Sequence, residues 1–430
     1  MRIAFIILFA SASLILWVAI GCDKAVAPVK NMPGAIPTSP PSWPRFRGPG
    51  GSGVAAKGDY PLQWDAASGK NIIWKTPIAL KGESSPIVWG DRLFLTGGNA
   101  DTHEVFCLDT ASGKLIWQRS LKVNPAGDGI KVWKGYSHAP ATAVTDGTRV
   151  CTIFANGDLA CLDFAGKVLW QKFLGPLQNS YGYAASLDRY KDKLIVQLDQ
   201  KKAKNGTPRS KLLALNMASG RTVWETVRPV VDSWSTPGIV KVSKSWQIIT
   251  AANPYVIGHD AATGKELWRV DCLVGDVAPS PIYAGGLVFA AMESSALTAI
   301  RPDGKGNVTA THVAWQVTDG EFPSICSPVS DGKLLFLMPS SGYLICWDII
   351  TGKMVWEEDM EVAVVSSPAL VGEHLYVIGE EGEGLVVKAG REFKVTARNN
   401  LGEGCKTSPA FVSGRIYLRG ERHLFCLGRK

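Results

Sequence analysis

Short runs in which apolar and polar positions alternate recur through most of the chain. Residues 92–96, 193–197 and 287–291 are examples. A period of two is typical of β-strands, because successive side chains of a strand point to opposite faces of the sheet. The repeated part of the chain has no segment that keeps a 3.6-residue apolar period over the length of a helix. The pattern therefore predicts an all-β fold.

A turn motif separates these runs. It reads Asp-x-x-Ser/Thr-Gly-Lys/Arg and is followed within a few residues by Trp. Copies begin at Asp65, Asp109, Asp163 (shortened), Asn216, Asp260, Asp303 (stretched), Asp348 and Ala389 (degenerate). The Asp or Asn side chain favours the turn by accepting backbone hydrogen bonds, and the Gly supplies a left-handed conformation. The Trp then opens the next strand with a large flat surface.

A second motif, a small residue before Pro, opens one strand of each repeat. Its copies are Ser85-Pro86, Ala139-Pro140, Thr236-Pro237, Ser280-Pro281, Ser327-Pro328, Ser367-Pro368 and Ser408-Pro409, and residues 183–187 fill the third place without a Pro. Pro is tolerated at the first residue of a strand. Each repeat of roughly 40–54 residues then holds four strands, named A to D from the small residue to the Trp, which is the pattern of a propeller blade.

The two ends of the repeat region complement each other. The first repeat contributes only a D strand at residues 71–76, and the last repeat stops after a C strand at residues 423–427. Pairing these strands would close the ring and remove free sheet edges. We therefore predict that residues 45–430 form an eight-bladed β-propeller of four-stranded blades, with the N-terminal strand completing the last blade.

The turn motif resembles the repeat of PQQ-like, quinoprotein-type β-propellers, and the likeness covers about residues 65–428. That family contains dehydrogenases that bind pyrroloquinoline quinone (PQQ). It also contains propellers without a cofactor, among them the lipoprotein subunit of the outer-membrane β-barrel assembly machinery. In the family, the Trp of each blade packs against the next blade. The resemblance implies this docking role for Trp74, Trp117, Trp170, Trp224, Trp268, Trp315 and Trp356.

The first 22 residues predict export. Met1-Arg2 precedes an apolar run at residues 3–21, and residues 18–22 resemble a lipobox that ends in Cys22, the expected lipidation site. An uncleaved membrane anchor is the alternative. Residues 23–44 are rich in Pro, which predicts an extended tether. Either reading gives a membrane-anchored, periplasm-facing protein of the bacterial cell envelope, and leaves open which membrane holds it.

The cysteines do not predict a redox centre. Cys107, Cys161, Cys346 and Cys426 occupy one repeat position in different blades, which suits small buried residues. Cys151 and Cys161 face each other across a hairpin, but the expected one-residue offset disfavours a disulfide. The resemblance to PQQ dehydrogenases would require two adjacent cysteines beside the quinone, and the sequence has no Cys-Cys pair and no Cys-x-x-Cys-His haem motif.

Other catalytic signatures are also missing from the sequence. The chain has no Gly-x-Ser-x-Gly elbow and no His-Glu-x-x-His helix, and its six histidines are dispersed. The acidic run at residues 380–384 resembles a hairpin tip more than a calcium site. We therefore predict no catalytic residues, no metal and no cofactor, including PQQ. The net charge of +8 is spread along the chain, so no nucleic-acid partner is expected, and we expect a monomer.

The segments that precede the A strands should meet at one end of the central channel. Their polar and aromatic residues form a candidate binding funnel: Tyr136, His138, Tyr181, Tyr183, Trp234, Glu321 and Lys406. Such a funnel suits a ligand or peptide, although these residues would also serve simply to fill the channel. Three functions follow from the sequence. The first is a non-enzymatic scaffold for partner proteins of the envelope, bound through loops or strand edges. The second is a carbohydrate or peptide binder, and the third a PQQ-dependent dehydrogenase.

Overall fold

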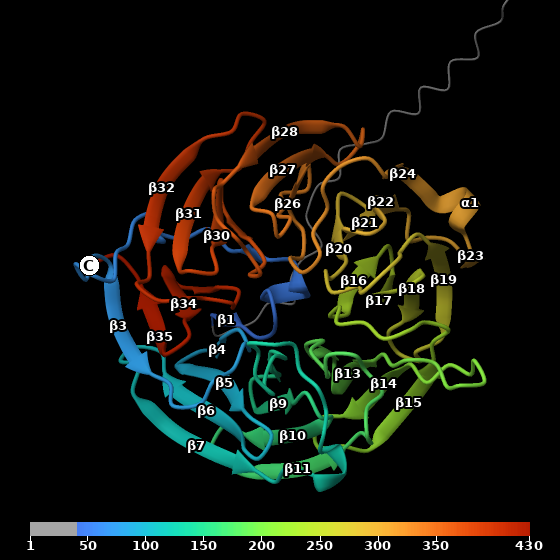
Figure 1. Cartoon of the computed structure of the whole chain (residues 1–430), viewed down its shortest axis with the longest axis horizontal. Helices are drawn as coiled ribbons and strands as arrows, with labels where there is room; N and C mark the ends of the chain where they lie inside the picture. The colour runs from blue at the N-terminus through green and yellow to red at the C-terminus, as the bar shows by residue number, and fades with distance from the viewer. Residues whose placement is uncertain (1–40) are drawn as a thin grey trace, which may run out of the picture. The chain divides into compact units, whose positions relative to one another are not determined.

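The computed structural model describes residues 41–430. Cys22, the lipobox and most of the tether lie outside this range. Eight antiparallel sheets surround a central axis, as Figure 1 shows, and this confirms the predicted eight-bladed propeller. Within residues 41–430, no helix is long and apolar enough to cross a membrane.

The first four blades follow one another along the chain. Blade 1 holds β4 (Ile87–Trp89), β5 (Arg92–Gly98), β6 (His103–Asp109) and β7 (Leu115–Leu121). Blade 2 holds β8 (Val144–Thr145), β9 (Arg149–Ile153), β10 (Asp158–Asp163) and β11 (Val168–Phe173). Blade 3 holds β12 (Asp188–Tyr190), β13 (Lys193–Leu198), β14 (Lys211–Asn216) and β15 (Thr222–Val227). Blade 4 holds β16 (Gly238–Val242), β17 (Ser245–Ala252), β18 (Tyr255–Asp260) and β19 (Glu266–Asp271).

The other four blades complete the ring. Blade 5 holds β20 (Ile282–Ala284), β21 (Leu287–Met292), β22 (Ala296–Ile300) and β24 (Val313–Val317). Blade 6 holds β25 (Val329–Ser330), β26 (Leu334–Leu337), β27 (Tyr343–Asp348) and β28 (Met354–Asp359). Blade 7 holds β29 (Ala369–Val371), β30 (His374–Ile378), β31 (Glu383–Lys388) and β32 (Val395–Asn400). Blade 8 holds β33 (Ala410–Val412), β34 (Arg415–Arg419), β35 (His423–Leu427) and the early strand β3 (Ile72–Pro77).

Six shorter elements lie outside the four-stranded pattern. They are β1 (Ser42–Trp43) beside β4, β2 (Val54–Ala55) beside β29, β23 (Gly306–Asn307) beside β19, the 3-10 turns η1 (Pro49–Gly51) and η2 (Pro125–Gly127), and helix α1 (Thr309–His312). Through β1, Ser42 and Trp43 pair with Trp89 and Val88 of blade 1.

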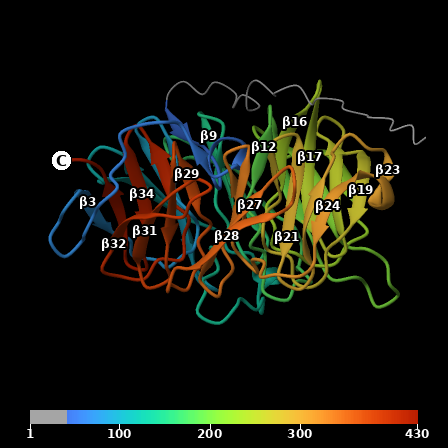
Figure 2. The same cartoon turned by 90° about the horizontal axis from the view of Figure 1, so that it is seen from above.

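Antiparallel strands give the ring two different ends. In every blade the A–B and C–D turns lie at one end, which we call the turn face. The B–C hairpins and the D–A connections lie at the opposite end, which we call the loop face. Figure 2 shows the ring from the side, with these two ends above and below.

A closed ring of hydrogen bonds joins the eight blades around the axis. In each blade, a backbone N–H just before the A strand donates to the hydroxyl of the equivalent Ser or Thr in the next blade, at 2.8–3.1 Å. The residues, in order, are Ser85, Thr142, Ser186, Thr236, Ser280, Ser327, Ser367 and Ser408, which donates back to Ser85. All eight are buried, so each bond satisfies a donor that water cannot reach. This ring corrects one motif assignment, because in blade 2 the equivalent residue is Thr142 and not Ala139.

Tryptophans on the D strands join the blades near the outer rim. Trp74, Trp117, Trp170, Trp315 and Trp356 each donate their indole N–H to a backbone carbonyl in the C–D turn of the next blade, at 2.9–3.1 Å. The rings of four of them also lie on the turn glycine of that blade, namely Trp74, Trp117, Trp170 and Trp315. A Cβ atom at Gly113, for example, would lie 2.6 Å from the ring of Trp74. Trp224 lies on Gly264 in the same way, but its N–H has no partner within residues 41–430.

Trp268 differs from the expected docking role. It is fully buried within its own blade, over Gly258, and donates to Gln247 Oε1 at 2.8 Å. Gln247 Nε2 donates in turn to the carbonyl of Pro302 in blade 5, at 3.0 Å. Trp268 therefore reaches the next blade through a glutamine. The longer turn of blade 5 makes room for this arrangement, since β23 pairs in parallel with β19 at the seam.

The residue opposite each Trp on the C strand is small. Cys107, Cys161, Cys346 and Cys426 pair with Trp117, Trp170, Trp356 and Trp74 respectively. Ala214, Gly258 and Ala299 occupy the same position in three other blades. The bulk of the indole explains why a small residue recurs there, and the repeated cysteines are part of the core, as the sequence predicted.

Cys151 and Cys161 form a disulfide, contrary to the sequence prediction. Their Cα atoms are 4.1 Å apart and the two residues are direct cross-strand partners. The predicted offset was wrong because the hairpin turn contains three residues, 155–157. The turn is closed by the backbone N–H of Phe154, which donates to the carbonyl of Asp158 at 2.9 Å. The extra residue brings the two side chains to the same level of the sheet.

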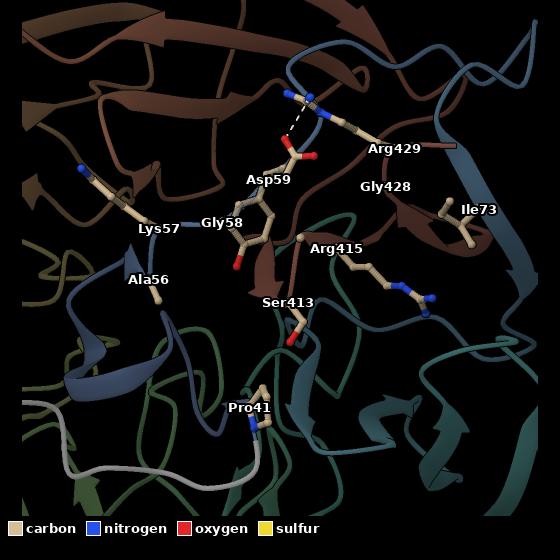
Figure 3. A pocket seen from close by; sticks show the side chains of 12 residues that line it. Pro41, Ala56, Lys57, Gly58, Asp59, Ile73, Ser413, Arg415, Gly428 and Arg429 are labelled. Atoms are coloured by element: carbon tan, nitrogen blue, oxygen red, sulfur yellow. Dashed lines mark ion pairs between the residues drawn. The ribbon is translucent and has the colours of Figure 1, made fainter.

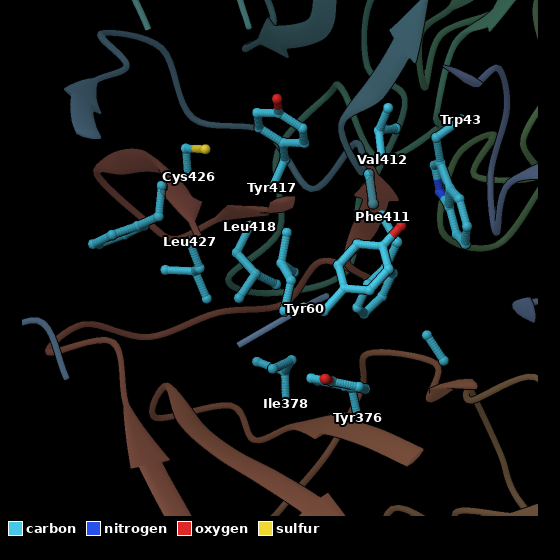
Figure 4. Close-up of a cluster of buried hydrophobic side chains, with 14 of the residues drawn as sticks. Trp43, Tyr60, Tyr376, Ile378, Phe411, Val412, Tyr417, Leu418, Cys426 and Leu427 are labelled. Atoms are coloured by element: carbon cyan, nitrogen blue, oxygen red, sulfur yellow. The ribbon is translucent and has the colours of Figure 1, made fainter. Parts of the chain in front are cut away.

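The seam between blades 7 and 8 is filled from the N-terminal side. Blade 7 has Ala397 at its Trp position, since Ala397 pairs with Val386. Trp64 supplies the missing ring: it is 1% exposed and stacks on Tyr376 with a centroid distance of 6.3 Å. Tyr60 and Trp43 pack on Phe411 in the same buried cluster, which Figure 4 shows. Residues 41–66 thus form part of the core.

Candidate functional site

The N-terminal segment closes the turn-face end of the central channel. Residues 41–55 run from β1 to β2 and turn across the axis, and Figure 1 shows them in blue at the centre of the ring. We call this segment the plug. Its backbone is bonded to blades 1, 2 and 7, through Pro41 O to Gly90 N, Pro44 O to Thr145 N and Gly53 O to Leu370 N, at 2.8–3.1 Å.

Two buried arginines hold the plug to further blades. Arg45 pairs with the buried Asp188 of blade 3 and donates to Pro237 O of blade 4 at 3.0 Å. Arg47 donates to Pro328 O of blade 6 and has no carboxylate partner within residues 41–430. Burial lowers the pKa of the Arg47 guanidinium. The plug therefore uses its charges inside the protein and offers few of them to a ligand.

A groove of about 550 Å³ lies on the turn face, where the plug leaves the axis. Figure 3 shows Lys57, Asp59, Arg415 and Arg429 along its sides. Arg429 pairs with Asp59 at 2.9 Å, and Arg415 donates to the backbone carbonyl of Thr110 at 3.0 Å. Arg415 and Arg429 thus already have partners, and Asp59 is the one acid among the described residues that line the groove.

Three aromatic side chains meet on the loop face over blades 2 to 4. Tyr181 lies between Trp133, at a centroid distance of 4.7 Å, and Trp234, at 5.0 Å. Tyr181 also donates its hydroxyl to Asp276 Oδ2 at 3.2 Å, and Trp234 donates to Gly182 O at 3.0 Å. The side chain of Trp133 is 55% exposed. We call Trp133, Tyr181 and Trp234 the aromatic cluster.

A second group of the predicted funnel residues lies near blades 1 and 8. Lys406 Nζ stands 4.7 Å from the centre of the Tyr136 ring, a cation–π geometry. Burial raises the pKa of Tyr136 to about 12. Beside it, Glu83 accepts from the backbone and hydroxyl of Ser137 at 3.0 and 2.6 Å. These groups mainly fix the D–A connections at the mouth of the channel.

The remaining predicted funnel residues do not join either group. Tyr183 is 3% exposed, and burial raises its pKa. His138 is partly buried, and burial lowers its pKa. Glu321 accepts from Ser341 at 2.5 Å in the connection between blades 5 and 6. The structure thus brings Tyr181 and Trp234 together, and Tyr136 and Lys406, but it places Tyr183 in the core and Glu321 apart.

A buried polar network supports the aromatic cluster from below. Arg228 pairs with Asp199, and both side chains are fully buried. Asp199 also accepts from Gln197 at 2.8 Å and from Ser233 at 2.6 Å. Because Ser233 precedes Trp234, this network fixes the loop that carries the indole. Hydrogen bonds and an ion pair that converge on one buried carboxylate restrict the motion of the surrounding loops.

Sequence reasoning missed Trp133, the most exposed member of the cluster. It lies in the long connection 122–143 and is flanked by Lys131 and Lys134. Its signal was present in the sequence, because it is a Trp that stands outside the repeat position and between two lysines in a loop. A search limited to residues directly before the A strands could not select it.

The described residues hold no recognisable redox or metal chemistry. Within residues 41–430, no group of three or more His, Cys, Asp or Glu side chains is placed to bind a metal ion. The cysteines outside the disulfide are buried, and burial raises the pKa of Cys326 to about 12, which makes it a poor nucleophile.

Comparison with solved structures places the fold among known propellers. The chain superposes on a europium-containing methanol dehydrogenase with a TM-score of 0.65 and 13% identity, covering 88% of this chain and 89% of that one. For BamB from Moraxella catarrhalis the TM-score is 0.59 and the identity 16%, covering 83% of this chain and 98% of that one. For the quinohemoprotein alcohol dehydrogenase of Comamonas testosteroni they are 0.66 and 14%, covering 91% and 81%. At these identities the likeness establishes the fold alone.

Sequence comparison is more specific. No curated protein matches the chain. A family description does match, over residues 48–196, 208–323 and 304–393, which is more than half of the chain. These ranges include the plug from residue 48 onward and end in blade 7, before β32. The chain belongs to the PQQ-like repeat family described as outer membrane protein assembly factor BamB.

Proposed function

We propose that this protein is a non-enzymatic scaffold of the cell envelope, which captures a partner protein on its loop face. The observation that carries this proposal is the exposed aromatic cluster. Large aromatic side chains that are held rigidly and remain open to solvent are typical of the energetic centres of protein interfaces. Family membership supports the same reading, since the family is described as an assembly factor.

The two ends of the channel favour recognition over catalysis. The plug fills one end with arginines that are bonded to the blades, and the aromatic cluster lies at the other end. A quinone with calcium does not fit these residues. The disulfide of the described chain joins two strands of one hairpin, and the acids of residues 380–384 do not form a metal site. We therefore propose that the protein works without PQQ.

Site-specific crosslinking in living cells tests the scaffold proposal. A photoreactive phenylalanine derivative placed at position 133 should crosslink reproducibly to one envelope protein. The same group at Ile350, which is 79% exposed on a C–D turn of the opposite face, is the matched control and should not. Equal products from both positions, or none from position 133, would contradict the proposal.

A separate measurement tests the absence of quinone chemistry. The full-length protein in detergent is titrated with PQQ and Ca²⁺, and dye-linked oxidation of alcohols and aldoses is followed. We expect no turnover above that of free PQQ. Saturable binding with turnover would replace the scaffold by a dehydrogenase.

A further inference from the structure

Six exposed cations lie on the two segments next to the aromatic cluster. Lys131 and Lys134 flank Trp133, and the hairpin between β13 and β14 carries Lys201, Lys202, Lys204 and Arg209. This hairpin projects from the rim of the ring in Figure 1 and toward the loop face in Figure 2. None of the six forms an ion pair within residues 41–430, where pairs occur at neighbouring residues such as Lys193 and Lys211.

Hydrogen bonds hold the basic hairpin beside the aromatic cluster. Lys201 N donates to Gln178 O at 2.8 Å, and Gln178 N donates to Gln200 Oε1 at 3.0 Å. Both contacts join the hairpin to the loop that carries Tyr181. The backbone of Lys131 also approaches Gly182 of that loop. The cations and the aromatic rings therefore share one surface, which we call the aromatic–basic surface.

The acids near this surface do not neutralise it. Asp232 is buried and accepts two hydrogen bonds from Ser180, at 3.0 and 2.8 Å. Asp276 accepts the hydroxyl of Tyr181, and Asp128 is exposed at the edge of the same connection as Trp133. Six cations thus face two exposed carboxylates. Unpaired charge of one sign attracts a partner of the opposite sign and speeds its encounter.

We infer that the aromatic–basic surface binds an acidic segment of a partner protein that also carries an apolar anchor. The inference rests on the proposed scaffold function and names the chemistry of its partner. The geometry of the rings favours a polypeptide over an acidic polysaccharide. Trp133 and Tyr181 meet at 82°, and Tyr181 and Trp234 at 38°. Rings at these angles do not form the continuous flat platform on which a sugar chain stacks. The exposed part of Trp133 offers apolar contact area to a peptide side chain.

Peptide binding to the full-length protein in detergent tests the inference. The probe is a fluorescein-labelled peptide that alternates Glu with Leu, followed by anisotropy. One control peptide has Gln in place of Glu, and a second probe is an oligogalacturonate of matched length. We expect the acidic peptide to bind in preference to both, and to bind more weakly as salt rises, since screening acts on exposed charges.

Three variants separate the contributions of charge and aromatic surface. Lys201→Ala/Lys202→Ala/Lys204→Ala should weaken peptide binding about tenfold, because half of the cations are removed. Trp133→Ala should weaken it roughly tenfold as well, the scale of one good aromatic contact. The matched control, Lys241→Ala/Lys244→Ala/Lys333→Ala, removes three exposed lysines from the turn face and should leave binding unchanged. Circular dichroism verifies that each variant is folded.

Each contrary result overturns the inference. Preference for the oligogalacturonate would make the surface a glycan site. If the triple-lysine control variant also lost peptide binding, or if Trp133→Ala bound the peptide as well as the wild type does, the interaction would be a general attraction of anions. Absence of peptide binding would also refute it. Crosslinking from position 133 decides the scaffold function independently, so a crosslinked protein without peptide binding refutes the acidic partner alone.

Discussion

The two ends of the channel use arginine, lysine and tryptophan in opposite ways. At the plug, Arg45 and Arg47 are buried, and their guanidinium groups bond to Asp188 and to backbone carbonyls of the blades. On the aromatic–basic surface, the cations are exposed and form no ion pair within residues 41–430, and Trp133 is 55% exposed. Trp64, by contrast, is 1% exposed in the seam between blades 7 and 8.

The difference teaches how to separate residues that hold the ring from residues that serve a partner. Residue type does not distinguish them, because both regions are rich in Trp and basic residues. Exposure does, since a side chain that holds the ring is buried against the blades, and a side chain that serves a partner stays open to solvent. Substitutions at the plug should therefore change stability, and substitutions on the aromatic–basic surface should change binding.

Arg45→Ala is the strongest test of this comparison. It leaves Asp188 buried without its partner, so the free energy of unfolding should fall by about 3–5 kcal/mol. Urea unfolding followed by tryptophan fluorescence measures the change. Arg45→Met/Asp188→Leu should recover most of the loss, because an apolar pair replaces the buried ion pair. The comparison fails if Lys201→Ala, the surface control, destabilises the protein as much as Arg45→Ala does.

Trp64→Ala and Trp133→Ala form a matched pair. Trp64→Ala opens a cavity between blades 7 and 8 and should cost about 3–5 kcal/mol of stability. Trp133→Ala should change stability by less than about 0.5 kcal/mol, because most of its ring is already in water. Urea unfolding of both variants measures this contrast. Comparable losses would mean that Trp133 also belongs to the fold.

The disulfide of blade 2 sharpens the comparison, because it lies in the blade beneath the loops of the aromatic cluster. Cys151→Ala/Cys161→Ala removes a crosslink over 10 residues of sequence, which should lower stability by about 2–3 kcal/mol. The wild-type protein in dithiothreitol should show a similar loss, measured as a lower Tm. A Tm that does not respond to either treatment would show that the blade does not depend on the crosslink.

The hydroxyl ring should give the smallest effect of the four. Ser367→Ala removes the acceptor for the backbone N–H of Ser327, and a buried donor without a partner costs about 1–3 kcal/mol. Ser68→Ala, in an exposed turn, is the control and should cost less than about 0.5 kcal/mol. Both are compared by urea unfolding. Equal effects would show that the ring adds nothing beyond an ordinary turn hydroxyl.

The sequence predicted those parts of the fold that depend on local turn chemistry. An Asp, a Gly and a following Trp lie within a few residues of each other, so the motif can be recognised in the sequence. Its eight copies give the number of blades. The pairing of β3 with β35 was predicted for the same reason, since each end of the chain supplied an incomplete repeat. The strand register at the hairpin of Cys151 was predicted wrongly, because it depends on a single added residue in the turn.

The remaining misses involve contacts between distant segments. Trp64 replaces the aromatic ring that blade 7 lacks. The sequence around Ala397 does not predict this contact, because Trp64 lies more than three hundred positions away. Thr142 joins the hydroxyl ring although no Pro follows it, because the hydroxyl and not the Pro makes the contact. Two of the three members of the aromatic cluster were predicted, because Tyr181 and Trp234 precede A strands, but Trp133 reaches them only through the fold.

The position of β3 sets an order for the assembly of the protein. The strand is synthesised early, but it pairs with β35, and Ser85 closes the hydroxyl ring only when Ser408 arrives. Blade 8 therefore forms only when two strands from opposite ends of the repeat region meet. Contacts between residues so far apart in sequence form slowly during folding. Until the last strands emerge, β3 and Trp64 have no blade to join. The ring therefore closes only after the strands of all eight blades have been made.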